Sequence, residues 1–157
     1  MPDDDDRARM LIAEFKADVE AKDDYGRTTL HLASMEGEEA TARMLIAELK
    51  ADVKAKDDQG RTALHWASIM GKETTARMLI AEFNADVEAK DTKGGTALHL
   101  ASMEGKETTA RILIAEFNAD VDALDNDGRT AQYYLDRFLE ESDYSESEES
   151  SAEESSS

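Results

Sequence analysis

The sequence DDQGRTALHWASIMGKETTARMLIAEFNADVEAK, residues 57–90, decides the fold because the chain repeats it at a fixed period. Related copies occupy residues 23–56 and 91–124, and the copies at 57–90 and 91–124 differ at nine of their 34 positions. Half copies flank the three units at residues 7–22 and 125–139. A repeat period of this length is typical of a solenoid, in which each unit packs only on its neighbours.

Each unit predicts two short helices followed by an extended arm. Thr62 is a natural N-cap for a first helix, which Gly71 would end in a left-handed conformation. A second helix is expected from about Glu73 to Phe83, where apolar residues recur at i, i+3, i+4 and i+7. Asn84 suits a left-handed cap, and residues 85–89 are too short for a helix and predict an extended arm that leads into the next turn.

Three spaced signatures recur in phase with this period. They are T-x-L-H at residues 28–31, 62–65 and 96–99, glycine at residues 37, 71 and 105, and A-D-V at residues 51–53, 85–87 and 119–121. On these residues the chain resembles the ankyrin repeat family over roughly residues 8–139. The resemblance implies an all-α solenoid of stacked helix-turn-helix units with β-turn arms. The chain departs from the family in its period of 34 rather than 33, and in having Thr or Ala where Pro usually follows the signature Thr.

The two ends of the chain differ from the repeats. We divide the chain into an acidic leader (1–6), a repeat domain (7–139) and a tail (140–157) that holds eight acidic residues, eight serines and no Lys or Arg. Such a composition predicts disorder, because it cannot bury enough apolar area to offset chain entropy. The half repeat 125–139 predicts an amphipathic capping helix. The half repeat 7–22 lacks its first helix, so we expect the neighbouring Leu30, Leu32 and Ala33 to be incompletely covered and available for self-association.

Composition excludes several classes of function. The 157 residues include no cysteine, which rules out disulfides and thiolate chemistry. No apolar run approaches the roughly 20 residues of a membrane span, so no membrane role is expected. The formal net charge of −19 and the lack of a basic face argue against direct nucleic-acid binding. An intracellular protein is expected, with cytoplasm and nucleus both open.

No residue pattern in the chain indicates catalysis or a cofactor. His31, His65 and His99 recur every 34 residues, but stacked helices lie about 8–10 Å apart, too far for equivalent imidazoles to share one metal ion. In ankyrin repeats this histidine forms hydrogen bonds beside the signature threonine. We therefore expect no enzyme, no cofactor and no metal site. Trp66, where the other repeats have leucine, is interpreted as half-buried filling, with a binding role as the alternative.

The positions that vary between repeats suggest a binding face. Five of the nine differences between residues 57–90 and 91–124 fall in the turn tip or in the last turn of the first helix. The resemblance places these positions on a concave groove, although neutral drift at solvated positions would look much the same. Met35, Ile69 and Met103 would form an apolar row along it. The candidate partner-binding residues are Tyr25, Arg27, Met35, Glu36, Gln59, Arg61, Ile69, Met70, Lys93, Met103 and Glu104.

Three functional hypotheses follow. The first is a non-enzymatic scaffold or adaptor that binds a protein or peptide with apolar anchors and some positive charge. The second is a regulatory inhibitor similar to the IκB-type inhibitors of Rel transcription factors, whose acidic tail masks a basic surface of its partner. The third is a fragment of a larger ankyrin protein. The tail offers acidic kinase sites at Ser145, Ser150 and Ser151, or it serves only as a solubilising segment.

Overall fold

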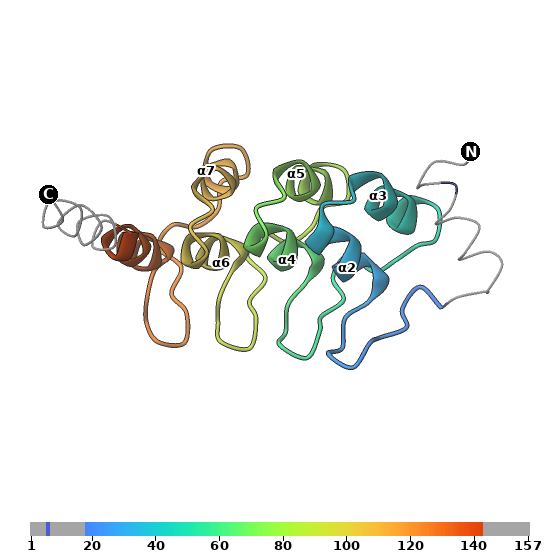
Figure 1. The fold of residues 1–157 in the computed structure, drawn as a ribbon, viewed down its shortest axis with the longest axis horizontal. Coiled ribbons are helices and arrows are strands. Elements are labelled where there is room, and N and C mark those ends of the chain that lie inside the picture. Colours follow the sequence, from blue (N-terminus) through green and yellow to red (C-terminus); the bar gives the residue numbers. More distant parts are fainter. Residues whose placement is uncertain (1–5, 7–17, 143–157) are drawn as a thin grey trace, which may run out of the picture.

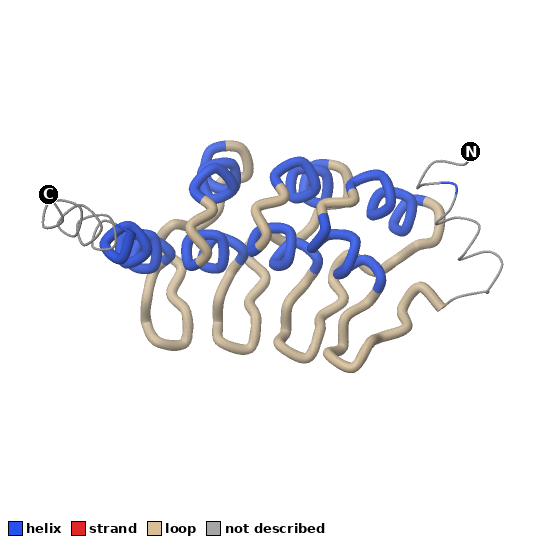
Figure 2. The backbone as a smooth tube through the Cα atoms, viewed as in Figure 1, coloured by secondary structure: helices blue, strands red, loops and turns tan. Residues whose placement is uncertain are grey.

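The computed structural model describes residue 6 and residues 18–142, and it shows a two-layered solenoid (Figure 1). One layer holds the first helix of each repeat, and the second layer holds the second helices, while the arms project from the opposite side of the first layer (Figure 2). The first helices are α2 (Thr29–Glu36), α4 (Ala63–Ile69) and α6 (Ala97–Met103), and the second helices are α3 (Glu39–Ala47), α5 (Glu73–Ala81) and α7 (Glu107–Ala115). A further helix over residues 131–142 extends the first layer. The predicted all-α repeat solenoid is confirmed.

A buried histidine starts each first helix and bonds to the next repeat. The Thr62 hydroxyl accepts from the His65 backbone N–H at 3.4 Å, and the Thr62 N–H donates to His65 Nδ1 at 2.9 Å. Because Nδ1 accepts, Nε2 carries the proton and donates to the Gly95 carbonyl at 3.1 Å. The same arrangement joins His31 Nε2 to the Arg61 carbonyl at 2.8 Å and His99 Nε2 to the Arg129 carbonyl at 2.9 Å. One side chain therefore caps its helix and positions the following arm.

Leucine and alanine fill the seam between repeats. Leu64 on the first helix and Leu79 on the second are fully buried, as are their counterparts in the neighbouring repeats. Alanines such as Ala67 and Ala76 are 0 % exposed, which lets adjacent helices approach closely. Helix α4 packs on α2 and α6, and α5 packs on α3 and α7, so the apolar core runs the length of the solenoid.

The second helices end earlier than the sequence pattern predicts. The expected end was Phe83, but α5 ends at Ala81. Asn84 adopts φ 56°, its N–H donates to the Ile80 carbonyl at 3.0 Å, and the Ala85 N–H donates to the Leu79 carbonyl at 2.9 Å. These bonds satisfy carbonyls that the helix end would otherwise leave free. The left-handed role predicted for Asn84 is confirmed, and Lys50 and Asn118 hold the equivalent position in their repeats.

The C-terminal helix passes the boundary predicted at residues 139–140. Leu139 stands where glycine ends the other first helices, so nothing in the fourth copy breaks the helix, and it continues through residue 142. Residues 140–142 are therefore helical rather than part of a disordered tail. Phe138 packs over Gly105, where a Cβ atom would overlap the phenyl ring. The remaining tail, residues 143–157, lies outside the described residues.

At the opposite end of the solenoid, Leu30, Leu32 and Ala33 were predicted to be incompletely covered. The structure confirms this for Leu32 only. Leu30 and Ala33 are 1 % and 3 % exposed, whereas Leu32 is 39 % exposed. Val19 packs against the core near this end. Residues 1–5 and 7–17, which include most of the predicted leader and half repeat, lie outside the described part of the chain. Among the helices that are described, none is long and apolar enough to cross a bilayer.

Lys50 offers a test of the helix-ending turn. A lysine at φ 60° is disfavoured, because in the left-handed region its Cβ crowds the following carbonyl, whereas asparagine adopts this region more readily. We expect Lys50→Asn to raise the free energy of unfolding by about 0.5–1 kcal/mol, measured by urea denaturation. Lys54→Asn is the charge-matched control at another exposed lysine. Equal stability changes in the two variants would contradict the backbone explanation.

His65 provides a pH test. Burial lowers the pKa of His65 below its ordinary value of 6.5 and outweighs the opposing hydrogen bond to the Gly95 carbonyl. Between the two pKa values the unfolded chain binds more protons, so stability is fully present above pH 6.5 and falls as pH drops toward the folded-state pKa. NMR titration of the assigned imidazole should give a midpoint below 6.5, and unfolding at pH 5.5 should need less urea than at pH 7. A midpoint at or above 6.5 would contradict this.

Candidate functional site

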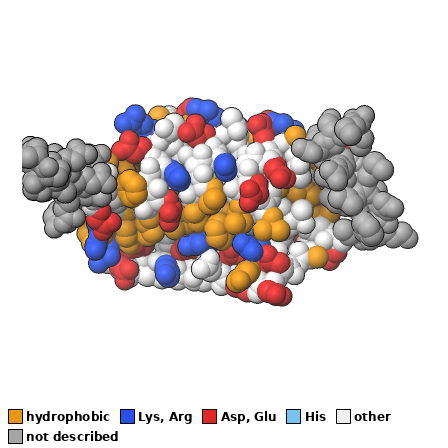
Figure 3. All heavy atoms as spheres, viewed as in Figure 1, with side chains coloured by type: hydrophobic (Ala, Val, Ile, Leu, Met, Phe, Trp, Pro, Cys, Tyr) orange, Lys and Arg blue, Asp and Glu red, His pale blue; other side chains and the backbone are white. Residues whose placement is uncertain are grey.

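Apolar side chains gather along the face formed by the first helices. Figure 3 shows them as a band at the level of α2, α4 and α6, with basic side chains beside it. Met35, Ile69 and Met103 are half-buried at the ends of these helices, and we refer to these three residues as the apolar row. Met70 stands beside the row with 43 % of its surface exposed. Because the repeats stack in register, side chains from three separate helices form one continuous strip.

Arginine and tyrosine border the row in the first repeat. The guanidinium of Arg27 lies 4.7 Å from the centroid of the Tyr25 ring, a cation–π arrangement. Arg27 Nε also pairs with Asp23 Oδ2 at 2.9 Å, and Nη1 approaches Met35 Sδ at 3.8 Å. Hydrogen bonds from the backbone N–H groups of Arg27 and Tyr25, together with the guanidinium, hold the pKa of Asp23 below its usual value despite some opposing desolvation. The turn carboxylate thus fixes the arginine over the ring.

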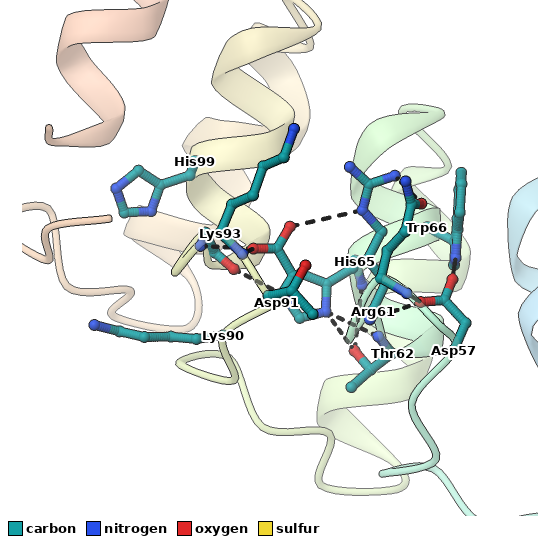
Figure 4. Close-up of polar contacts among 12 residues, drawn as sticks. Asp57, Arg61, Thr62, His65, Trp66, Lys90, Asp91, Lys93 and His99 are labelled. Atoms are coloured by element: carbon teal, nitrogen blue, oxygen red, sulfur yellow. Dashed lines mark hydrogen bonds and ion pairs between the residues drawn. The ribbon is translucent and has the colours of Figure 1, made fainter. Parts of the chain in front are cut away.

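The second repeat uses a different pairing, drawn in Figure 4. Trp66 Nε1 donates to Asp57 Oδ2 at 2.8 Å, so this carboxylate is engaged by its own repeat. Arg61 instead directs Nε toward Asp91 Oδ2 of the next repeat at 3.6 Å, and Nη1 donates to Gln59 at 3.0 Å. Its guanidinium stays over the Trp66 ring, 5.1 Å from the centroid. Trp66 is half-buried as expected, and its hydrogen bond gives it a positioning role beyond filling.

The capping helix repeats the Trp66 arrangement with a tyrosine. Tyr134, two periods after Trp66, donates its hydroxyl hydrogen to Asp125 Oδ2. Burial acts to raise the pKa of Asp125, but hydrogen bonds from Tyr134 and from backbone N–H groups outweigh it and hold this pKa below its usual value. Burial and the hydrogen bond to Asp125 raise the pKa of Tyr134. The guanidinium of Arg129 lies 4.5 Å from the centroid of the Tyr133 ring.

The predicted site residues fall into two groups. The apolar row and Met70 lie together on the first-helix face, and Glu36 and Glu104 are exposed at the helix ends beside them. The turn residues Tyr25, Arg27, Gln59, Arg61 and Lys93 lie on the arms. Of these, Arg27 and Arg61 each pair with a carboxylate of the chain itself. These two arginines therefore shape the face, and their charges are partly neutralised.

Sequence reasoning missed the C-terminal part of this face. Arg129 and Tyr133 belong to the half repeat, and Phe138 is 40 % exposed beside them. Arg129 stands one hundred and two residues after Arg27 and sixty-eight after Arg61, so the period alone would have placed it with them. Leu32, which was predicted to be exposed for self-association but was not counted with this face, lies one helical turn before Met35. The comparison of variable positions stopped at the third copy and therefore left out the cap.

The three histidines have their nitrogens engaged within the fold. Each Nδ1 accepts from a threonine N–H and each Nε2 donates to a carbonyl, so neither nitrogen faces an open site. Over residues 18–142 no group of three or more His, Cys, Asp or Glu side chains could hold a metal ion. The candidate phosphorylation sites Ser145, Ser150 and Ser151 lie outside the described residues.

Comparison with protein families agrees with this geometry. Residues 3–91 match the family model described as ankyrin repeats in three copies, and residues 93–126 match the model described as an ankyrin repeat. A search of curated proteins found no match. The two family matches together span the complete repeats and stop short of the capping helix.

The two aromatic hydrogen bonds to turn aspartates allow a paired test. Trp66→Phe and Tyr134→Phe keep an aromatic ring and remove the donor, and we expect each to lower the free energy of unfolding by about 1 kcal/mol, because the bond is to a charged group at a partly solvated site. Urea denaturation measures both. The double variant Asp57→Asn/Trp66→Phe should lower the free energy of unfolding by less than the sum of the decreases in the two single variants. Additive costs would show that the pair does not interact.

Proposed function

Because the chain belongs to the ankyrin repeat family, whose members are in general modules for binding other proteins, we propose that it is a non-enzymatic scaffold that holds a protein partner on its first-helix face. The partner contributes an extended or helical segment that lies along the apolar row. The observation that carries this proposal is the strip of Met35, Ile69, Met70 and Met103, which stays accessible although the fold fully buries the leucines near the start of the same helices, Leu30, Leu64 and Leu98.

The composition of the strip supports protein binding rather than neutral drift. Methionine adapts its shape to irregular apolar surfaces, and tyrosine, methionine and arginine are enriched at protein interfaces. Tyr25, 67 % exposed, and Trp66 supply flat rings beside the row, each with an arginine over it. Glu36 and Glu104 flank the row with negative charge, which favours a partner with basic residues beside its apolar anchors.

The rigidity of the face also supports this proposal. Its aromatic and arginine side chains are fixed by the turn aspartates, and its helices are fixed by the buried histidines. A face whose rotamers are already set loses less conformational entropy when a partner binds. A catalytic alternative would need a nucleophile or an acid–base pair, and the polar groups on this face instead engage one another in structural hydrogen bonds and ion pairs.

Met70→Glu tests the proposed face. The new carboxylate stands beside the apolar row and next to Glu36 and Glu104 in neighbouring repeats, so it should weaken partner binding at least tenfold through desolvation and like-charge repulsion. Quantitative affinity capture followed by titration of the recovered partner measures the effect. Circular dichroism should be unchanged, because Met70 is a C-cap residue with an exposed side chain.

Ile114→Glu is the matched control for this experiment. Ile114 is 42 % exposed, almost the same as Met70, but it belongs to α7 in the layer of second helices. We expect it to leave partner binding unchanged. Equal losses in the two variants would assign the effect to net charge, and unchanged binding of Met70→Glu would remove the first-helix face from the proposal.

A further inference from the structure

The three arginines of the first-helix face share one position in the repeat but differ in their partners. Arg27, Arg61 and Arg129 each lie over an aromatic ring, at 4.7, 5.1 and 4.5 Å from the centroid. Arg27 pairs with Asp23 of its own turn at 2.9 Å, and Arg61 approaches Asp91 of the following turn at 3.6 Å. Within residues 18–142, no carboxylate lies within ion-pair distance of Arg129.

Competition for the turn aspartates explains this difference. In the second repeat Trp66 occupies Asp57, so Arg61 turns to the next repeat for its carboxylate. In the cap Tyr134 occupies Asp125 in the same way. Within residues 18–142 no further copy of the turn follows the cap, so Arg129 lacks the next-repeat aspartate that Arg61 approaches. Its polar neighbour is Tyr134, whose pKa the guanidinium acts to lower against the effect of burial.

A depression of about 320 Å³ opens beside this unpaired charge. Its apolar walls are Met103 of the apolar row, Tyr133 and Phe138, the last two being 37 % and 40 % exposed. Arg137 and Glu141 also line the depression; they pair loosely with each other at 3.5 Å, and Arg137 donates to the Tyr133 hydroxyl at 3.1 Å. The depression therefore combines three apolar surfaces with Arg129, a cation that has no carboxylate partner among residues 18–142, at the C-terminal end of the apolar row.

We propose that this depression, which we call the cap pocket, receives a carboxylate of the protein partner together with an adjacent bulky apolar side chain. The carboxylate takes the place at Arg129 that Asp23 and Asp91 take at Arg27 and Arg61, while the apolar group packs between Phe138 and Met103. This inference rests on the proposed function, and it adds the orientation in which the partner segment lies along the apolar row. The partner segment places its acidic residue at the cap and a basic residue toward Glu36, at the opposite end of the apolar row.

The chain's own acidic tail fits the cap pocket less well. The only large apolar residue in its sequence is Tyr144. The acidic residues farther along, at 146–154, have only serine, alanine and glutamate around them. Beyond Tyr144, the tail sequence offers carboxylates with no bulky apolar residue beside them. A partner segment can offer both.

A pair of small probes tests the cap pocket without knowledge of the partner. N-acetyl-phenylalanine carries a carboxylate beside an aromatic ring, and N-acetyl-phenylalaninamide has the same shape without the charge. In NMR titrations of the full chain, we expect the acid to bind with a dissociation constant on the order of 1 mM and to shift the resonances of Arg129, Tyr133 and Phe138. The amide should bind about tenfold more weakly, because it forms no charge-assisted bond.

Matched variants assign the effect to Arg129. Arg129→Gln should weaken binding of the acid about tenfold. Arg129→Lys keeps the positive charge, so it should weaken binding less than Arg129→Gln does. Arg111→Gln removes the same charge from an exposed position on α7 and should have no effect. The fold tolerates the change at Arg129 because its backbone carbonyl, not its side chain, accepts the His99 hydrogen bond. Thermal denaturation checks this directly.

Three results would overturn the cap pocket. They are equal binding of the acid and the amide, an equal loss in Arg129→Gln and Arg111→Gln, and binding that appears only when the chain is truncated after residue 142. The last result would mean that the tail occupies the pocket. All three are independent of the capture experiment with Met70→Glu, because the probes bind without the partner. The cap-pocket proposal can therefore be wrong while the proposed binding at the apolar row is correct, and the reverse also holds.

Discussion

The hydrogen bond from a buried imidazole to the arm of the next repeat is the interaction on which the stacking depends. Each ring closes the N-terminal turn of its own helix through Nδ1 and reaches a carbonyl about thirty residues onward through Nε2. Both groups are buried, so a missing partner would leave an unsatisfied polar atom and cost about 1–3 kcal/mol. Hydrophobic burial between repeats is less directional. The histidines therefore fix the spacing that lets leucine and alanine pack in the seam.

Fixed spacing has a consequence for the surface. With the first helices in register, equivalent residues from successive repeats form continuous lines, and a single apolar position becomes a row. The turn aspartates then decide which way the neighbouring arginines point. An aspartate that accepts from an aromatic hydroxyl or indole N–H is less available to its own arginine, as Asp57 and Asp125 illustrate. The residue at one position of the repeat, Leu, Trp or Tyr, thereby changes how charge is distributed along the first-helix face.

The cap combines two of these effects. Leu139 in place of the helix-ending glycine lets the last helix continue to residue 142, and Arg137 and Phe138 stand in it at the positions that Met103 and Glu104 hold in the preceding repeat. The face thus ends in a helix with exposed rings rather than in another copy of the repeat, which makes its C-terminal end chemically different from its middle.

The sequence by itself determined the repeat, its period, the helix N-caps and the buried leucines, because these follow from local propensity and from spacing along the chain. It also placed Met35, Ile69 and Met103 in one row, since register follows from an exact period. It could not give the end of the second helix, where carbonyl bonds to Asn84 and Ala85 compete with further helical turns. Nor could it reveal that Arg61 approaches an aspartate of the next repeat, or that Arg129 has no carboxylate partner among residues 18–142. Those outcomes depend on which donor lies within hydrogen-bonding distance of each aspartate. Only the tertiary structure decides that, because the competing donors come from different helices and repeats.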